Sequence, residues 1–462
     1  MKFQPFTLIA TALLAACTAA TTPTAAPGGL TSAPYVKLQH PDWSRDAVIY
    51  EINVRQYSDA GTFDAVREDL PRLKELGVDI LWLMPIHPIG ELNRKGTLGS
   101  YYSVKDYYGI NPEFGTKADF KRFVETAHAQ GFKVILDWVA NHTAWDNDLA
   151  INHPDWYEKD WKGDFRPTPW WDWSDIIDLD FSNPDVRAYM SDAMTYWVEE
   201  MNIDGFRADV AGYVPLEFWD GLRARLDAIK PVFMLAEWQT RDLHAHAFDA
   251  TYAWEWKEAL QNIAQGKADT SALYGYYSAN ESAWPKDAMR MTYTDNHDQN
   301  SWDGLPPDIY GDAYEAAIVL QFTGEGIPLI YSGQECANPN RLEFFEKDPI
   351  IWNCDAPLNA LFKDLVQLKT DNPVLHNGAW GATTTKVENS NPHKVFSFIR
   401  QNEDGNAVLV VANVSDAAQT FRFTDPLPSG TYRVFRTDTA ITIGMERMTL
   451  PAWGWSVYHR DE

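Results

Sequence analysis

Eight short apolar runs of strand character constrain the fold of this chain more than any other feature. They lie at residues 47–54, 80–84, 133–137, 203–208, 232–236, 248–252, 289–294 and 327–331. Between them, residues 63–76 and 116–130 carry apolar side chains at the spacing of amphipathic helices. This alternation predicts an α/β fold in which eight parallel strands close into a (β/α)8 barrel. A doubly wound open sheet is the alternative, but no Gly-rich phosphate turn follows the first run.

Two segments interrupt the alternation and predict further domains. Residues 141–180 form a long insertion after the third run, dense in Trp, Asp and Pro, and long insertions usually serve function. After residue 377 the helical spacing ends, and strand candidates follow at 394–400, 407–414, 419–423, 431–436 and 453–459. The predicted organisation is a barrel over 41–140 and 181–376, an insertion domain at 141–180, and an antiparallel β-sandwich domain at 377–462.

The first 40 residues predict export. Residues 1–16 combine Lys2 with an apolar stretch too short to span a bilayer, which is typical of a signal peptide. The ending Leu14-Ala15-Ala16-Cys17 resembles a bacterial lipoprotein box, so we expect cleavage before Cys17, a lipid anchor on its sulfur and a location in the cell envelope. An ordinary signal peptide is the alternative. Residues 17–40, rich in Ala, Thr, Pro and Gly, then predict a flexible tether.

Composition narrows the possible partners. The 462 residues include 39 Lys+Arg against 65 Asp+Glu, a formal charge of -26, and no basic run could follow a phosphate backbone. We therefore expect no nucleic acid partner. The 20 Trp exceed what a core requires, and indole faces suit stacking on sugar rings, although core packing explains most of them. The two remaining cysteines, Cys336 and Cys354, could pair or stay free, and the oligomeric state stays open.

Polar side chains stand where four of the predicted strands end, which in a barrel is the end that carries chemistry. Arg207 precedes Asp209 by two residues, so both side chains lie on one face of a strand and the guanidinium can hold the carboxylate ionised. A structural salt bridge is the alternative for this pair. The candidates at the four strand ends are Asp137, Asn141, His142, Arg207, Asp209, Glu237, His297 and Asp298.

These strand ends resemble the sequence motifs of the alpha-amylase family (glycoside hydrolase family 13). The motifs are Asp-x-x-x-Asn-His at 137–142, Gly-Phe-Arg-x-Asp at 205–209, a glutamate at 237, and Asn-His-Asp at 296–298, in the family's order. The resemblance spans roughly residues 46–460. It implies a retaining hydrolase that cleaves α-1,4-glucosidic bonds in starch or maltodextrins, without an organic cofactor.

The resemblance implies three catalytic carboxyl groups. Retaining hydrolysis needs one ionised carboxylate and one protonated carboxyl group about 5 Å apart. Asp209 would be the nucleophile, kept charged by Arg207. Glu237 would be the proton donor, because the apolar residues 233–236 and Trp238 beside it favour a raised pKa. Asp298 would bind hydroxyl groups of the sugar that is cleaved.

Other positions match the family's substrate contacts. Tyr102 corresponds to a stacking tyrosine, although Ser100-Tyr101 replaces the usual His-Gly before it. His142 and His297 would hydrogen-bond the same sugar, and Asp137 would orient Arg207. His87 is a weaker candidate, because a lone histidine at a strand end is as often a structural group.

The family often binds calcium between barrel and insertion, and Asn141 and Asp178 match two of those ligand positions. Oxygen ligands suit this hard cation. After the nucleophile, however, typical alpha-amylases continue with Lys-His where this chain has Gly212-Tyr213. The roles of that pair in product-side sugar binding and in calcium binding therefore do not carry over.

Several activities share the same catalytic set. An α-glucosidase, a cyclomaltodextrinase or neopullulanase, and a transglycosylase differ from an alpha-amylase in their loops rather than in these carboxylates. A noncatalytic glucan-binding relative is the alternative from another class. Such proteins lose carboxylates, and this chain keeps all three.

Overall fold

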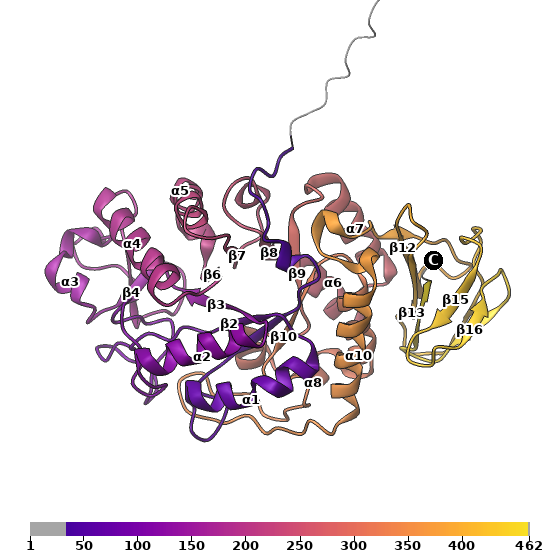
Figure 1. Ribbon diagram of the computed structural model, residues 1–462, viewed down its shortest axis with the longest axis horizontal. Helices are drawn as coiled ribbons and strands as arrows, with labels where there is room; N and C mark the ends of the chain where they lie inside the picture. Colours follow the sequence, from indigo (N-terminus) through magenta and orange to yellow (C-terminus); the bar gives the residue numbers. More distant parts are fainter. Residues whose placement is uncertain (1–33, 461–462) are drawn as a thin grey trace, which may run out of the picture. The chain divides into compact units, whose positions relative to one another are not determined.

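The computed structural model describes residues 34–460, of which Val36 onward forms one compact unit (Figure 1). The predicted signal peptide, Cys17 and most of the predicted tether lie outside the described residues. Within the described range, no helix combines the length and the apolar character that crossing a bilayer requires. The domain boundaries themselves stay predictions.

Eight parallel strands close into a barrel, as the sequence predicts, with neighbours in the order β1-β10-β9-β8-β7-β6-β3-β2. Each strand falls within one predicted apolar run or extends it by a residue. The strands are β1 (Ile49–Ile52), β2 (Ile80–Leu83), β3 (Lys133–Trp138), β6 (Gly205–Ala208), β7 (Phe233–Ala236), β8 (Ala250–Tyr252), β9 (Met289–Thr292) and β10 (Ile327–Tyr331).

Helices alternate with these strands along the chain. In α1, the Thr62 side chain caps the first turn by accepting from the Ala65 N–H, and Gly77, with φ of 90°, ends the helix. The longer helices are α1 (Phe63–Leu76), α2 (Lys117–Ala129), α4 (Pro184–Glu200), α5 (Leu216–Asp227), α6 (Trp254–Ala264), α7 (Thr270–Ala283), α9 (Tyr314–Thr323) and α10 (Pro357–Asp371). Two short helices are α3 (Asp148–Asn152) and α8 (Pro306–Tyr310).

The barrel interior changes from apolar to polar along the strands. Side chains such as Ile49, Ile80 and Ile135 belong to one buried apolar cluster inside the barrel. Two residues further along β1 and β3 stand Glu51 and Asp137, both buried. Because parallel strands share their direction, these polar side chains gather at the C-terminal end of the barrel, where barrel enzymes place their chemistry.

The segment after β3 folds back on itself. Strand β4 (His142–Ala144) pairs antiparallel with β5 (Ile176–Asp178), with His142 opposite Asp178. This short two-stranded sheet closes the base of the inserted segment, which contains α3 and most of the tryptophan-rich residues. It also fixes His142 close to the barrel end, because β4 follows β3 after only a few residues.

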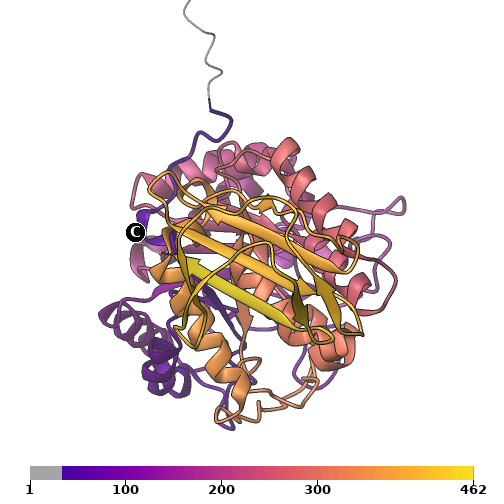
Figure 2. The ribbon, with the colours of Figure 1, turned by 90° about the vertical axis from the view of Figure 1, so that its right-hand side faces the viewer.

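The C-terminal region contains two antiparallel sheets (Figure 2). The larger has the order β11 (Thr385–Lys386), β12 (Val395–Gln401), β13 (Ala407–Asn413), β18 (Trp455–Arg460), β15 (Thr431–Val434) and β16 (Ala440–Thr442), and the smaller pairs β14 (Gln419–Phe421) with β17 (Met448–Leu450). Their apolar faces share one buried cluster. The antiparallel β region predicted from the alternating pattern is therefore confirmed, with β11, β16 and β17 as additional strands.

A buried arginine joins this region to the barrel. The Arg400 guanidinium, in β12, donates to the carbonyl oxygens of Gly324 at 2.7 Å, Ala382 at 2.8 Å and His376 at 3.2 Å. Gly324 follows α9, the helix before the last barrel strand. The contact therefore connects the C-terminal sheet directly to the barrel.

Candidate active site

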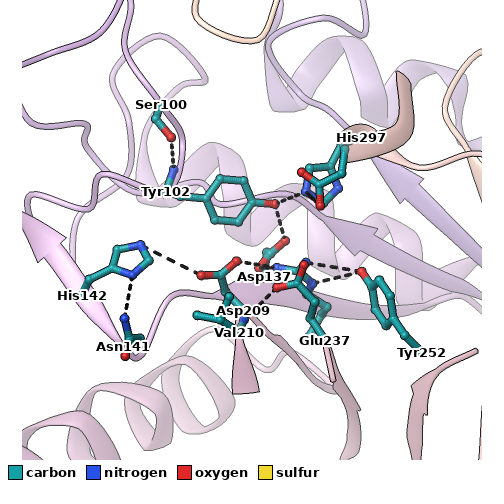
Figure 3. A network of polar contacts seen from close by, with 12 residues as sticks. Ser100, Tyr102, Asp137, Asn141, His142, Asp209, Val210, Glu237, Tyr252 and His297 are labelled. Atoms are coloured by element: carbon teal, nitrogen blue, oxygen red, sulfur yellow. Dashed lines mark hydrogen bonds and ion pairs between the residues drawn. The ribbon is translucent and has the colours of Figure 1, made fainter. Parts of the chain in front are cut away.

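One guanidinium holds carboxyl groups from three adjacent barrel strands (Figure 3). Arg207, fully buried in β6, lies 2.9 Å from Asp137 Oδ1 and 3.0 Å from Asp209 Oδ1 through Nη1, and its Nη2 lies 3.1 Å from Glu237 Oε1. Asp137 comes from β3, and Glu237 directly follows β7. The structure thus brings Asp209 and Glu237 together around a single cation, as the sequence motifs predict.

A glycine at the start of β6 permits this arrangement. Gly205 has φ of 148°, and a Cβ there would lie 1.9 Å from the Phe233 carbonyl oxygen in β7. No side chain fits at that distance, so glycine allows β6 and β7 to pair closely. The glycine of the Gly-Phe-Arg-x-Asp motif therefore has a structural role that sets the positions of Arg207 and Asp209.

Burial raises the proton affinity of the clustered carboxyl groups unequally. It raises the pKa of Glu237 to about 7 and that of Asp209 to about 6, against the opposing charge of Arg207. The expectation that Arg207 keeps Asp209 charged is therefore incomplete, because the loss of solvent raises the pKa of Asp209 by more than the guanidinium lowers it. Between these values Asp209 is mostly ionised and Glu237 mostly protonated, which is the division of roles that retaining hydrolysis needs.

The carboxyl group of Glu237 is positioned by the loop that follows Asp209. The Val210 N–H donates to Glu237 Oε2 at 2.7 Å. Val210 has φ of 36°, a left-handed conformation that costs energy for a β-branched residue. The backbone therefore keeps a strained turn that directs an N–H at Glu237.

Tyr102 and His297 complete one side of the cluster. The Tyr102 hydroxyl donates to Asp137 Oδ2 at 3.1 Å and lies 2.8 Å from His297 Nε2, and the two rings stack with centroids 5.5 Å apart. Asp298 Oδ2 lies 3.5 Å from His297 Nε2. The Asp298 side chain is 45% exposed, against 10% for Asp209, so it is open to a ligand in the cleft.

Glu51 is a site residue that the motifs did not reveal. It is fully buried in β1, with Oε1 at 2.5 Å from His297 Nδ1. Burial lowers the pKa of His297, but Asp298 and Glu51 together raise it to about 9, so the ring is protonated at neutral pH. The signal in the sequence was a lone carboxylate in the apolar run 47–54.

The two other histidines predicted to bind substrate, His142 and His87, differ in position. His142 Nε2 lies 4.0 Å from Asp209 Oδ2, at the site. His87 is buried, with its ring 5.3 Å from those of Trp138 and Trp197, and its Nδ1–H donates to the Gly109 carbonyl oxygen at 3.1 Å. His87 is absent from the lining of the catalytic cleft, so its environment favours the structural alternative over a substrate contact.

Asn141 and Asp178 lie in contact, and the groups around Asp178 are hydrogen-bond donors and an arginine. Asn141 Nδ2 donates to Asp178 Oδ1 at 3.1 Å, Thr168 donates to the same oxygen, and Arg166 Nη2 lies 3.9 Å from Asp178 Oδ2. Calcium takes six to eight oxygen ligands. Among residues 34–460, no group of three or more acidic, His or Cys side chains could hold a metal ion. Calcium at this pair stays a prediction.

The cluster lies in a cleft of about 400 Å³. Besides the catalytic candidates, its lining includes Trp173, Trp302, Phe344 and Phe345. Trp302 sits in a π-helical turn, Gln299–Asp303, directly after Asp298. The segment with the two phenylalanines is closed by a Cys336–Cys354 disulfide, which resolves the open question of these cysteines.

Fold and site together define the class of barrel glycoside hydrolases: a closed parallel barrel with paired carboxyl groups of unequal proton affinity at its C-terminal end. The model of the alpha-amylase catalytic domain matches residues 52–427. The chain belongs to the alpha-amylase family.

Similarity to individual proteins supports membership of this family. Alpha-amylase MalA from Haloarcula japonica is 32% identical over 408 residues, which cover 85% of this chain and 58% of MalA. The crystal structure of an alpha-amylase from Lactobacillus plantarum superimposes with a TM-score of 0.81 at 31% identity, covering 91% of this chain and 100% of that one. The noncanonic maltogenic alpha-amylase AmyB from Thermotoga neapolitana gives a TM-score of 0.80 at 30% identity, with 90% and 98% covered.

Proposed function

We propose that the protein is a retaining hydrolase of α-1,4-linked glucans, acting on starch or maltodextrins. The observation that carries this proposal is the pair Asp209 and Glu237, joined through Arg207 Nη1 and Nη2 at 3.0 Å and 3.1 Å. Its relatives include an alpha-amylase and a cyclomaltodextrinase, and their names support an α-glucan as the substrate.

The proposed reaction has two displacements at the anomeric carbon. In the first, the Asp209 carboxylate attacks this carbon while Glu237 gives its proton to the departing glycosidic oxygen. In the second, the ionised Glu237 takes a proton from water, whose oxygen displaces Asp209. Both steps pass through an oxocarbenium-like transition state, which the negative charge of Asp209 stabilises.

In this mechanism, the other residues of the site bind the sugar or orient Arg207. Asp298 accepts hydrogen bonds from sugar hydroxyls, and the protonated His297 donates to the same ring. The Tyr102 ring offers its face for stacking. Asp137 holds Arg207 in place from the side opposite the substrate.

Product analysis distinguishes the activities that share this catalytic set. Amylose, pullulan and short maltooligosaccharides are each digested and the first products are separated by chromatography. An endo-acting amylase releases a range of maltooligosaccharides from amylose. Glucose as the sole initial product would contradict endo action and favour an α-glucosidase. Selective cleavage of pullulan would favour a neopullulanase.

The Asp209→Asn variant tests whether the protein is an enzyme or a noncatalytic glucan-binding protein. We expect turnover to fall by at least about 10³-fold, while binding of maltooligosaccharides in calorimetry is retained. Turnover equal to that of the parent would show that Asp209 is not the nucleophile.

A further inference from the structure

A cavity of about 210 Å³ lies at the end of the barrel opposite the catalytic cleft. Its lining includes Met289, the first residue of β9, and Gly326, which directly precedes β10, whereas Asp298 follows the other end of β9 and lines the cleft. Other lining residues belong to α7 and β12, which are in contact through the Tyr274 and Phe396 rings at 4.7 Å (Figure 1). We name this space, where the barrel meets the C-terminal sheet, the junction cavity.

Two buried arginines line the junction cavity without a carboxylate partner. Arg290, in β9, is 2% exposed and Arg400, in β12, is 1% exposed. Arg290 donates to the Tyr252 carbonyl oxygen at 3.0 Å and to Asn280 Oδ1 at 3.4 Å, and its Nε–H is buried without an acceptor. Arg400 donates to three backbone carbonyl oxygens. No carboxylate among residues 34–460 makes an ion pair with either guanidinium.

The pKa values of both arginines reflect this unbalanced burial. Burial lowers the pKa of Arg290 by more than Tyr276 and Glu255 raise it. Burial also lowers the pKa of Arg400 to about 10, against the opposing charge of Glu325. Both side chains stay charged near neutral pH. Because a buried charge is costly unless it is paired, two charged guanidiniums at one cavity indicate that an anion balances them.

The other charged groups of the lining leave the cavity positive. Lys286 and Glu281 are exposed, and the half-buried Glu325 accepts from the Thr384 N–H. The lining thus carries three basic and two acidic side chains, although the whole chain has a formal charge of -26. A water molecule occupies about 30 Å³ of liquid, so the cavity has room for a small ion and accompanying waters.

Neighbouring residues hold both guanidiniums in position. The Arg290 Cζ lies 3.7 Å from the centroid of the Trp284 ring, a cation–π contact that covers one face of the guanidinium. Gly381 leaves space for Arg400, because a Cβ at this glycine would lie 2.5 Å from Arg400 Nη2. The protein itself therefore orients the two cations of the site, and a ligand would not have to order them.

We propose that the junction cavity binds a small oxyanion, a carboxylate or a phosphate, beside Arg290 and Arg400, and that the bound ion stabilises the contact between the barrel and the C-terminal sheet. Guanidinium N–H donors match the paired oxygens of such ions. Arg290 belongs to a barrel strand and Arg400 to the C-terminal sheet, so one ion interacts with both regions. An ion that binds the folded protein raises its free energy of unfolding.

Calorimetric titration of the full chain with sodium phosphate and with sodium acetate tests this site. The buffer contains about 0.15 M sodium chloride, because salt screens exposed charges more than buried ones. We expect one saturable site, and the lower dissociation constant of the two identifies the preferred oxyanion. In Arg290→Gln this constant should rise at least about tenfold, because a charge-assisted hydrogen bond is lost. The preferred ion should also raise the melting temperature of the parent more than that of the variant.

Two exposed lysines provide a matched control. Lys286 lines the junction cavity, whereas Lys267, between α6 and α7, does not. We expect the dissociation constant to rise about threefold in Lys286→Gln and to keep the parent value in Lys267→Gln.

A parent that binds neither ion, or equal dissociation constants in the parent and Arg290→Gln, would overturn the inference. If Arg290→Gln does not fold, equal constants in the two lysine variants decide against the site in the same way. These measurements involve no glucan, so a parent enzyme that cleaves no glucan would contradict the proposed function alone.

Discussion

At the scale of residues, one cation shared by three carboxyl groups determines the chemistry. Arg207 contacts Asp137, Asp209 and Glu237, so its single charge cannot balance three ionised groups in a buried site. Burial raises the pKa of all three carboxyl groups, to about 6 for Asp137 and Asp209 and to about 7 for Glu237. Glu237, whose side chain is 14% exposed, therefore keeps its proton to the highest pH of the three, as the group proposed as the acid should.

The pH dependence of kcat/KM follows from these proton affinities. Activity should rise as pH increases through about 6, where Asp209 ionises, and fall as pH increases through about 7, where Glu237 loses its proton. The expected profile is a narrow bell with its maximum between these values. Initial rates on a maltooligosaccharide from pH 4 to about 9 measure it. A rate that still rises above pH 8 would contradict this assignment.

Glu51 acts on the site through His297. In Glu51→Gln the negative charge beside His297 Nδ1 is lost, so the pKa of His297 should fall from about 9. NMR titration of the ring proton measures this shift. We expect kcat/KM to fall by about tenfold or more, because a charge-assisted hydrogen bond is weakened. An unchanged His297 titration with reduced activity would indicate a structural effect only.

Much of the catalytic set could be predicted from sequence because the motifs fix both the residue type and the strand end. Asp209, Glu237 and Arg207 meet where the motifs predict. Glu51 could not be identified, because its role depends on a ring 246 residues away that only barrel closure brings close. The sequence also did not show that His87 packs among buried tryptophans.

At the scale of elements, alternating apolar runs were sufficient to predict the barrel, whereas the loops that shape the cleft were not predictable. The range of α1, Phe63–Leu76, equals the predicted helix because its cap, apolar spacing and terminal glycine agree. The π-helical turn Gln299–Asp303 has no such signal. Trp302 in this turn contacts Phe344 and Phe345, with ring centroids 5.2 Å and 6.0 Å apart, and these residues lie more than 40 positions further along the chain.

The Cys336–Cys354 disulfide should stabilise one wall of the cleft. It closes a loop of sequence separation 18 that carries Phe344 and Phe345. Reduction should lower the free energy of unfolding by about 3 kcal/mol, since the unfolded chain regains freedom. Urea unfolding with and without dithiothreitol measures this change. The Cys336→Ser, Cys354→Ser double variant should unfold like the reduced protein and should not respond to dithiothreitol. A parent protein whose free energy of unfolding is the same with and without dithiothreitol would contradict the prediction.

At the scale of the whole molecule, the tryptophans divide between the core and the exposed surface. Trp82, Trp138, Trp197, Trp219 and Trp256 are fully buried, whereas Trp161, Trp170, Trp171 and Trp302 are exposed. Composition revealed the excess of aromatic residues but not this division. It depends on which side chains the fold encloses and which the insertion and loops leave exposed.

We also propose that the protein is a lipoprotein of the cell envelope, anchored through Cys17. Cys17→Ser removes the sulfur that would carry the lipid, so the variant should move from the detergent phase to the aqueous phase in detergent partitioning of expressing bacteria. Catalytic activity measured on the purified variant should equal that of the parent. A parent protein found wholly in the aqueous phase would contradict the anchor.

In the proposed mechanism, Asp209 attacks the anomeric carbon while Glu237 acts first as acid and then as base. A fluorinated glycosyl fluoride, which slows hydrolysis of the covalent intermediate, tests it by mass spectrometry of proteolytic peptides. We expect one glycosyl adduct, on the carboxyl group of Asp209, and none in Asp209→Asn. An adduct on another carboxyl group, or turnover of the reagent without any adduct, would contradict it.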